Sequence, residues 1–314
     1  MKIAIVGAGA VGCYFGGRLA IDGHDVVFIA RGDTLEGLRT GGLRVDSVLE
    51  DVVLPEVVAT DDPTAIGPVD AVLLAVKSWQ VAEAAQMMRP LVNSDTLIVP
   101  LQNGVDSPGQ LAERFAAENV LGGMCKIGSR VVAPGRIEHF AIDPFIAFGF
   151  PDGRRPGAAE DLRNAFLAAG VTAELSTDVR VPMWEKFVLI APWSGLGAVT
   201  RAPIGVLREL PETRSMLIAA MDEVTAVARA LGVGLSDDHV TRTVSFIDSV
   251  AAGASTSMQR DILAGKRSEL MAQTGAVVRI GAEVGCPTPM NGFFLDSLRP
   301  LELRAEGKVK FEPT

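Results

Sequence analysis

The sequence predicts two domains, an α/β domain built on a parallel sheet followed by a domain made of helices only. Apolar runs typical of buried strands alternate with helical patterns as far as residue 175, and after residue 179 only helical patterns follow. A change from alternating strands and helices to helices alone indicates a second layer architecture, hence a second domain. The chain of 314 residues is long enough for both. We place the boundary at residues 176–178, giving domains 1–177 and 178–314.

The first strand runs directly into a glycine-rich turn. The apolar residues 3–6 are followed without a break by Gly7-Ala8-Gly9-Ala10-Val11-Gly12. Gly7 lets the chain turn tightly, Gly9 lets a pyrophosphate approach the backbone, and Gly12 lets the next helix pack closely on the sheet. Residues 11–21 have helical spacing, so the free N–H groups of a helix N-terminus face the phosphates. With a second strand at residues 25–30, this predicts a Rossmann-type dinucleotide site; the alternative is a tight turn that is only structural.

The remaining elements follow the same alternation up to the boundary. We expect a short helix at residues 34–39, extended pieces at 43–59, buried strands at 70–76 and 96–101, and helices at 81–88 and 107–118. Residues 119–128 read as extended, 130–140 and 144–150 as antiparallel strands around a Pro134-Gly135 turn, 158–169 as a helix and 171–175 as a strand. The second domain is expected to contain helices near residues 181–190, 212–231, 237–252, 267–284 and 293–305, and residues 308–314 to form a frayed tail.

Charge and composition narrow the class of partner. The chain has 29 basic and 38 acidic side chains, a net charge of −9, which argues against nucleic acid or an anionic membrane as the main partner. Residues 3–6 are too short for the core of a signal peptide, and no segment reads as a membrane span, so we expect a cytoplasmic protein.

The cysteines and histidines are scattered along the chain. Because no two cysteines form a CxxC pair, we expect neither a disulfide framework nor a metal site. The three histidines, which we expect on the surface or in loops, are His24, His139 and His239.

Three strand tips carry side chains that suit a cofactor, because ligands of open parallel sheets bind at the carboxyl ends of the strands. Arg31 stands where an NAD site would usually have an acidic residue, and its guanidinium can pair with a 2′-phosphate, which favours NADP(H). Asp33 leaves NAD open as the alternative. Lys77 and Asn103 follow the next two buried strands; they are either further contacts of the cofactor or substrate, or loop residues that face water.

The helical domain offers two candidate acid–base groups. Lys186 lies in an otherwise apolar helix, where burial lowers the pKa of an ammonium group and suits it to donate a proton; the alternative is a lysine whose stem merely covers the core. Glu269 reads as opening another apolar helix, and by itself it could simply compensate the helix dipole.

These residues together resemble the ketopantoate reductases (2-dehydropantoate 2-reductases), which join a Rossmann domain to an all-α domain like that of 6-phosphogluconate dehydrogenase. The likeness extends over essentially the whole chain. The matching segments are GAGAVG, Arg31, VKSWQ at 76–80, QNG at 102–104, WEK at 184–186, and SMQRD at 257–261 with Glu269.

The resemblance implies NADPH-dependent reduction of a 2-keto acid, 2-dehydropantoate to pantoate in pantothenate biosynthesis. Arg31 would bind the 2′-phosphate, and Lys77 and Asn103 would line the nicotinamide end, with Asn103 near the substrate. Lys186 would be the general acid.

The resemblance assigns two further roles in the helical domain. Ser257 would bond the acid end of the substrate, and Glu269 would hold Lys186 or the substrate hydroxyl.

The chain departs from the family at two positions. The family usually has Asn four and eight residues after the catalytic Lys, on the same helix face; here these are Ile190 and Ser194. Ser194 is retained as a candidate substrate contact. Ile190 cannot bond a substrate hydroxyl, and such a loss can change discrimination by about 10⁴. The alternatives are therefore a related reductase of another 2-keto acid, or a non-catalytic NADP(H)-binding protein. The long apolar helix at 212–231 makes a homodimer plausible.

Overall fold

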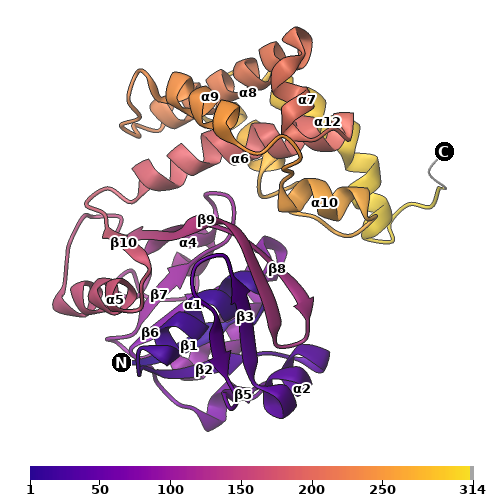
Figure 1. Cartoon of the computed structure of the whole chain (residues 1–314). Helices are drawn as coiled ribbons and strands as arrows, with labels where there is room; N and C mark the ends of the chain where they lie inside the picture. The colour runs from indigo at the N-terminus through magenta and orange to yellow at the C-terminus, as the bar shows by residue number, and fades with distance from the viewer. Residues whose placement is uncertain (312–314) are drawn as a thin grey trace. The chain divides into compact units, whose positions relative to one another are not determined.

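The computed structural model describes residues 1–311, which divide into two compact units (Figure 1). The first unit comprises Met1–Gln102 and Ser107–Pro182, and the second comprises Asn103–Asp106 and the chain from Met183 onward. The division falls inside helix α6 (Arg180–Thr200). The boundary expected at residues 177 and 178 stays a prediction.

The first unit is built on an all-parallel sheet of five strands in the order β5-β2-β1-β6-β7. Residues 3–6, 71–74 and 97–100 of three of its strands are all buried, as the continuous apolar runs predict. The predicted α/β architecture is confirmed. The strands are β1 (Lys2–Val6), β2 (Asp25–Ile29), β5 (Val58–Thr60), β6 (Ala71–Leu74) and β7 (Leu97–Pro100).

A second sheet of five strands completes this unit. A long antiparallel hairpin turns at Pro134 and Gly135, as expected, and the order of the other strands is β10-β9-β3-β4 with β8 paired to β9. The strands are β3 (Leu43–Ser47), β4 (Val52–Leu54), β8 (Gly122–Ala133), β9 (Arg136–Gly149) and β10 (Thr172–Leu175).

Helix α1 (Ala10–Ile21) contacts strands of both sheets (Figure 1). A Cβ atom at Gly16 would lie 2.7 Å from Ile5 and Phe28 of the parallel sheet, and one at Gly17 would lie 3.0 Å from Leu43 of the second sheet. Adjacent glycines therefore let the helix approach a sheet on either side. This explains why α1 is apolar around most of its circumference.

The other helices of the first unit agree broadly with the predicted pattern. The helix expected at residues 107–118 ends early, at Ala112, before a turn. The helices are α2 (Gly32–Gly41), α3 (Val81–Met87), α4 (Ser107–Ala112) and α5 (Gly157–Ala168), with short 3₁₀ turns η1 (Pro63–Ala65), η2 (Ser78–Gln80) and η3 (Arg89–Leu91).

In the described part of the second unit, only helices are found among the regular elements, as predicted. The first of them, α6, does not end near Ile190 but continues through Pro192. A proline inside a helix costs about 3 kcal/mol; burial of the flanking apolar side chains, including Trp193 and Leu196, offsets this.

Two short helices, α7 (Ile204–Glu209) and α10 (Ser257–Leu263), were not expected, and α11 (Thr274–Val284) begins later than expected. Residues 267–273, predicted as helical, form a turn before α11. The expected tail forms no helix or strand at 308–311, and residues 312–314 lie outside the described residues. The helices are α7 (Ile204–Glu209), α8 (Pro211–Ala230), α9 (His239–Ser249), α10 (Ser257–Leu263), α11 (Thr274–Val284) and α12 (Pro289–Ala305).

Candidate active site

The glycine turn leaves room for an anion at the N-terminus of α1. Gly7 has φ +103°, and a Cβ atom there would lie 2.7 Å from the backbone nitrogen of Val76. A Cβ atom at Gly12 would lie 2.2 Å from the carbonyl oxygen of Gly7, whereas one at Gly9 would meet no atom within 4 Å. The first turn of α1 contains no acidic residue, and Gly9 provides no capping side chain. This turn therefore fits the pyrophosphate of a dinucleotide.

Arg31 lies directly after β2, at the carboxyl edge of the parallel sheet. Its side chain is 58% exposed, and its Nη1 lies 2.6 Å from Oε1 of Glu83, on α3. Nη2 lies 3.1 Å from the sulfur of Met87. Asp33 is exposed in the first turn of α2. The guanidinium of Arg31 thus already binds one planar oxygen group, the Glu83 carboxylate. A phosphate would take the place of this carboxylate.

Lys77 follows β6 at the same edge of the sheet. Its Nζ lies 5.8 Å from the centre of the Trp79 ring. The end of β6 is fixed by Gln102, whose side-chain amide donates to the carbonyl oxygens of Leu74 (2.8 Å) and Val76 (3.1 Å). The carboxyl ends of β1, β2 and β6 therefore carry the glycine turn, Arg31 and Lys77 on neighbouring strands, as the sequence predicts.

The segment Asn103–Asp106, which leaves β7, packs as part of the second unit. The Asn103 side-chain amide donates to Oε2 of Glu269 at 3.4 Å, and Arg279 pairs with Asp106 at 2.6 Å. A Cβ atom at Gly104, where φ is +110°, would lie 2.6 Å from the carbonyl oxygen of Ala272. Two predicted site residues that are distant in the sequence, Asn103 and Glu269, are thus brought together. Glu269 lies in the turn before α11 and does not open the helix as expected.

Lys186 lies on α6 and is half-buried, and Ile190 is one helical turn further on the same face. Ser194 is fully buried, and its hydroxyl has no hydrogen-bond partner among the described residues. Ser257 is the first residue of α10 and is half-buried; the helix is capped by Thr256, whose hydroxyl accepts from the N–H of Gln259.

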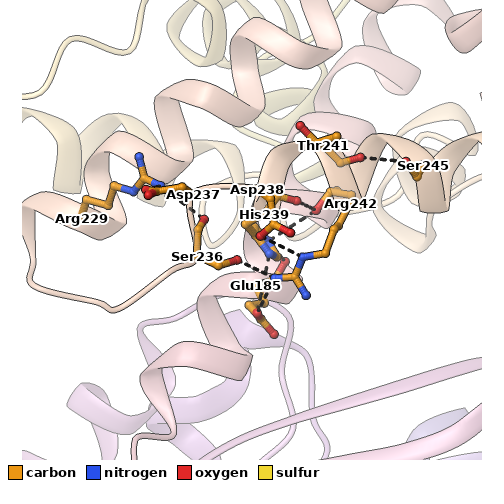
Figure 2. Close-up of polar contacts among 10 residues, drawn as sticks. Glu185, Arg229, Ser236, Asp237, Asp238, His239, Thr241, Arg242 and Ser245 are labelled. Carbon is orange, nitrogen blue, oxygen red and sulfur yellow. Dashed lines mark hydrogen bonds and ion pairs between the residues drawn. The ribbon is translucent and has the colours of Figure 1, made fainter.

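The residue before Lys186 is held by a polar cluster on α9 (Figure 2). His239 is 7% exposed; its Nε2 lies 3.3 Å from the carbonyl oxygen of Glu185 and its Nδ1 lies 3.6 Å from Oε1 of the same residue. Arg242 lies 3.7 Å from the same carboxylate. Burial lowers the pKa of His239, and the nearby Glu185 carboxylate opposes this in part.

The surface position expected of the histidines is wrong for two of them, His139 and His239, which are both buried. Each ring finds polar partners inside the fold: Ser47 and two backbone carbonyl groups for His139, and Glu185 for His239. The two carbonyl groups near His139 belong to Ala141 and Ile142, close by in the chain, whereas the sequence gives no local sign of the contacts with Ser47 and Glu185, which are 92 and 54 residues away.

Comparison with known proteins gives the family. The model described as Ketopantoate reductase PanE/ApbA matches residues 3–153, and the one described as Ketopantoate reductase PanE/ApbA C terminal matches residues 178–302. The chain belongs to the ketopantoate reductase family.

Among the relatives, a 2-dehydropantoate 2-reductase of Archaeoglobus fulgidus is 30% identical over 96% of this chain and 98% of its own. An uncharacterized oxidoreductase of Bacillus subtilis, YkpB, is also 30% identical, over 86% of this chain and 88% of its own. A crystal structure of 2-dehydropantoate 2-reductase from Geobacter metallireducens is 33% identical, covers 96% of this chain and 99% of its own, and has a TM-score of 0.90. The predicted family and fold are confirmed.

The cysteines are divided between the two units of the fold. Cys13, Cys125 and Cys286 form no disulfide within residues 1–311, and burial raises the pKa of Cys13 to about 12, so that thiol is not ionised near neutral pH. Within residues 1–311 no group of three or more His, Cys, Asp or Glu residues could hold a metal ion. In the same range, no helix is long and apolar enough to cross a membrane.

Sequence reasoning missed the residues that support the candidate site. The sequence indicates only that Glu83 belongs to a helix, yet it pairs with Arg31. Ser268 and Glu302 were not singled out, yet they form a buried pair next to Glu269. The sequence offers two signals for this pair. One is a Ser beside a candidate catalytic Glu, and the other is a Glu in the apolar stripe of the last helix.

Proposed function

We propose that this chain catalyses the NADPH-dependent reduction of 2-dehydropantoate to pantoate, as the related reductases are named for doing. The observation that carries the proposal is the approach of Asn103 and Glu269 to 3.4 Å. These two residues, 166 positions apart, are the ones that the family pattern assigns to the substrate end of the site. Their pairing gives a carboxylate and an amide fixed side by side, as needed to bind a hydroxyl or an ammonium group.

Residues of the first unit would bind the phosphates of the cofactor. The backbone of Gly7, Ala8, Gly9, Ala10, Val11 and Gly12 would bind the pyrophosphate. Arg31 would exchange Glu83 for the 2′-phosphate, which favours NADP(H) over NAD(H). Lys77, and Asn103 of the second unit, would contact the nicotinamide end. When bound, NADPH supplies the hydride that reduces the ketone carbon.

The chain's own residues would manage charge and protons at the ketone oxygen. Lys186 would place its ammonium group at this oxygen, stabilise the negative charge that develops there and donate a proton to it. Glu269 would orient Lys186 or the substrate hydroxyl, with Asn103 fixing the carboxylate. Ser257, and Ser194 if its buried hydroxyl becomes accessible, would bond the substrate's polar groups.

The test is NADPH oxidation by the purified protein with 2-dehydropantoate and a panel of branched 2-keto acids. We expect turnover of 2-dehydropantoate that Lys186→Ala abolishes while NADPH binding is retained. Turnover of other acids alone would indicate a related reductase whose substrate suits the apolar Ile190. Tight binding of NADPH without turnover of any acid would refute the enzymatic function.

The quaternary structure and location belong to the same proposal. A homodimer is proposed from the long amphipathic α8, and sedimentation equilibrium would test it. A cytoplasmic location is proposed from the sequence, and cell fractionation would test it.

A further inference from the structure

The last helix contains a buried carboxylate. Glu302, on α12, is 2% exposed. The backbone N–H of Ser268 donates to both of its oxygens, at 3.1 Å each, and the Ser268 hydroxyl donates to Oε2 at 2.6 Å. Three donated hydrogen bonds from one residue satisfy much of a charge that would otherwise be costly to bury.

Ser268 connects this carboxylate to both sides of Glu269. Its hydroxyl also accepts from the N–H of Leu270 at 3.2 Å, so Ser268 fixes the residue after Glu269 as well as itself. The carbonyl oxygen of Glu269 accepts from the N–H groups of Ala272 (3.1 Å) and Gln273 (2.9 Å). The backbone of Glu269 is therefore held before, at and after the residue.

Glu269 does not lie in a helix, so hydrogen bonds outside a regular element hold its backbone. The chain between α10 and α11 forms turns, and Glu269 lies five residues before Thr274, the first residue of α11. Glu269 therefore lacks the full hydrogen-bond ladder of a helix, although its carbonyl oxygen accepts from Ala272 and Gln273. The buried Glu302–Ser268 pair supplies a fixed point directly beside it.

We propose that Glu302 is a positioning residue, which acts through Ser268 to hold the Glu269 carboxylate in its reactive orientation. This inference rests on the proposed function. A carboxylate suits the task because both of its oxygens accept, whereas a Gln at this position would present an amide N–H₂ toward the Ser268 donors. A displacement of about 1 Å at a reacting group can reduce turnover by about 10².

The experiment compares Glu302→Gln and Ser268→Ala with Ser268→Thr, which keeps the hydroxyl. For each variant we would measure kcat, KM for the keto acid, the NADPH dissociation constant and the thermal midpoint. We expect kcat to fall about tenfold to a hundredfold in Glu302→Gln and Ser268→Ala, with NADPH binding unchanged within about twofold. In Ser268→Thr we expect most of the turnover to return.

Asp248→Asn serves as the matched control. Asp248 pairs with Arg214 through two hydrogen bonds, at 2.7 and 2.8 Å, in the same unit but on an exposed surface. This variant should lose a little stability and keep its kcat.

The outcomes separate this inference from the proposed function. If Ser268→Ala and Glu302→Gln lower the thermal midpoint but keep kcat while Glu269→Gln loses it, the pair is only structural and the inference is overturned. If Glu269→Gln itself keeps full turnover, the role proposed for Glu269 fails instead. Should Glu302→Gln fail to fold, the contrast between Ser268→Ala and Ser268→Thr decides.

Discussion

Replacing Arg31 with Ala should weaken NADPH far more than NADH. The two cofactors differ by the 2′-phosphate, which is the group that a guanidinium at the tip of β2 can read. A hydrogen-bonded contact between charged groups contributes about 1.5 to 3 kcal/mol. NADH cannot form this contact, so its binding should change by less than about twofold.

The existing partner of Arg31 reduces the expected loss. Arg31 and Glu83 are 58% and 63% exposed, so the pair that the phosphate must replace contributes about 0 to 1 kcal/mol. The net loss for NADPH in Arg31→Ala is then about 0.5 to 3 kcal/mol, or roughly twofold to 150-fold in affinity. In the complementary variant, Glu83→Gln, NADPH should bind up to about fivefold more tightly, because no carboxylate competes for the guanidinium.

The assay is fluorescence titration of both cofactors against the wild type and the two variants, at low and high salt. The difference between the cofactors should shrink as salt screens these exposed charges. If Arg31→Ala weakens NADPH and NADH equally, Arg31 does not read the phosphate. If Asp33→Ala weakens NADH while Arg31→Ala changes neither cofactor, the ribose is read by Asp33 and the expected NADP(H) preference is wrong.

Three further predictions concern the glycine turn, the buried histidine and the substrate. Gly12→Ala should lose about 1 to 3 kcal/mol of stability in denaturant unfolding, because its Cβ atom would meet a backbone oxygen. Gly9→Ala should keep its stability but bind NADPH about tenfold more weakly. Equal stability of the two variants would contradict this prediction. The pKa of His239 is lowered in the fold, so the stability it contributes is present above about pH 6.5 and is lost as the pH falls through the folded-state value; thermal midpoints of His239→Gln should therefore fall less steeply with acid than those of the wild type. Ile190→Asn should improve kcat/KM for 2-dehydropantoate about tenfold relative to 2-keto acids without a hydroxyl, and an equal change for both would exclude a contact with that hydroxyl.

Local patterns predicted much of the fold but not its long-range pairings. Apolar runs and turn residues indicated the strands, because these depend on neighbours in the chain. The grouping of Asn103–Asp106 with the second unit could not be predicted, because Asn103 contacts Glu269 and Gly104 lies against Ala272, both far along the chain. The continuation of α6 through Pro192 likewise reflects tertiary burial that overrides a local helix-breaking signal.

The residues of the candidate site also divide into those that the sequence indicates and those that depend on long-range packing. The candidate residues at the strand tips could be recognised in the sequence, because Arg31 and Lys77 interrupt apolar sequence at the ends of strands. The partners of these residues could not be recognised, because Glu83 looks like any acidic residue in the first turn of a helix. Ser268 and Glu302, 34 residues apart, become significant only once the fold places them together. Sequence thus indicates the groups that could react, while the groups that orient them depend on packing.

The glycines of the turn meet two requirements, one from the packing of the protein and one from the expected cofactor, and the motif alone does not distinguish them. Gly7 and Gly12 are required by the protein itself, because a Cβ atom at either would collide with backbone atoms of the turn or of the segment after β6. Gly9 is different: its backbone is extended, with φ −84°, and no atom of the protein fills the space beside it. Neither strain nor packing accounts for the absence of a side chain there, which agrees with the close approach of a phosphate that the motif predicts. Gly9 is therefore the position in this turn whose residue we attribute to the proposed cofactor contact and not to the fold.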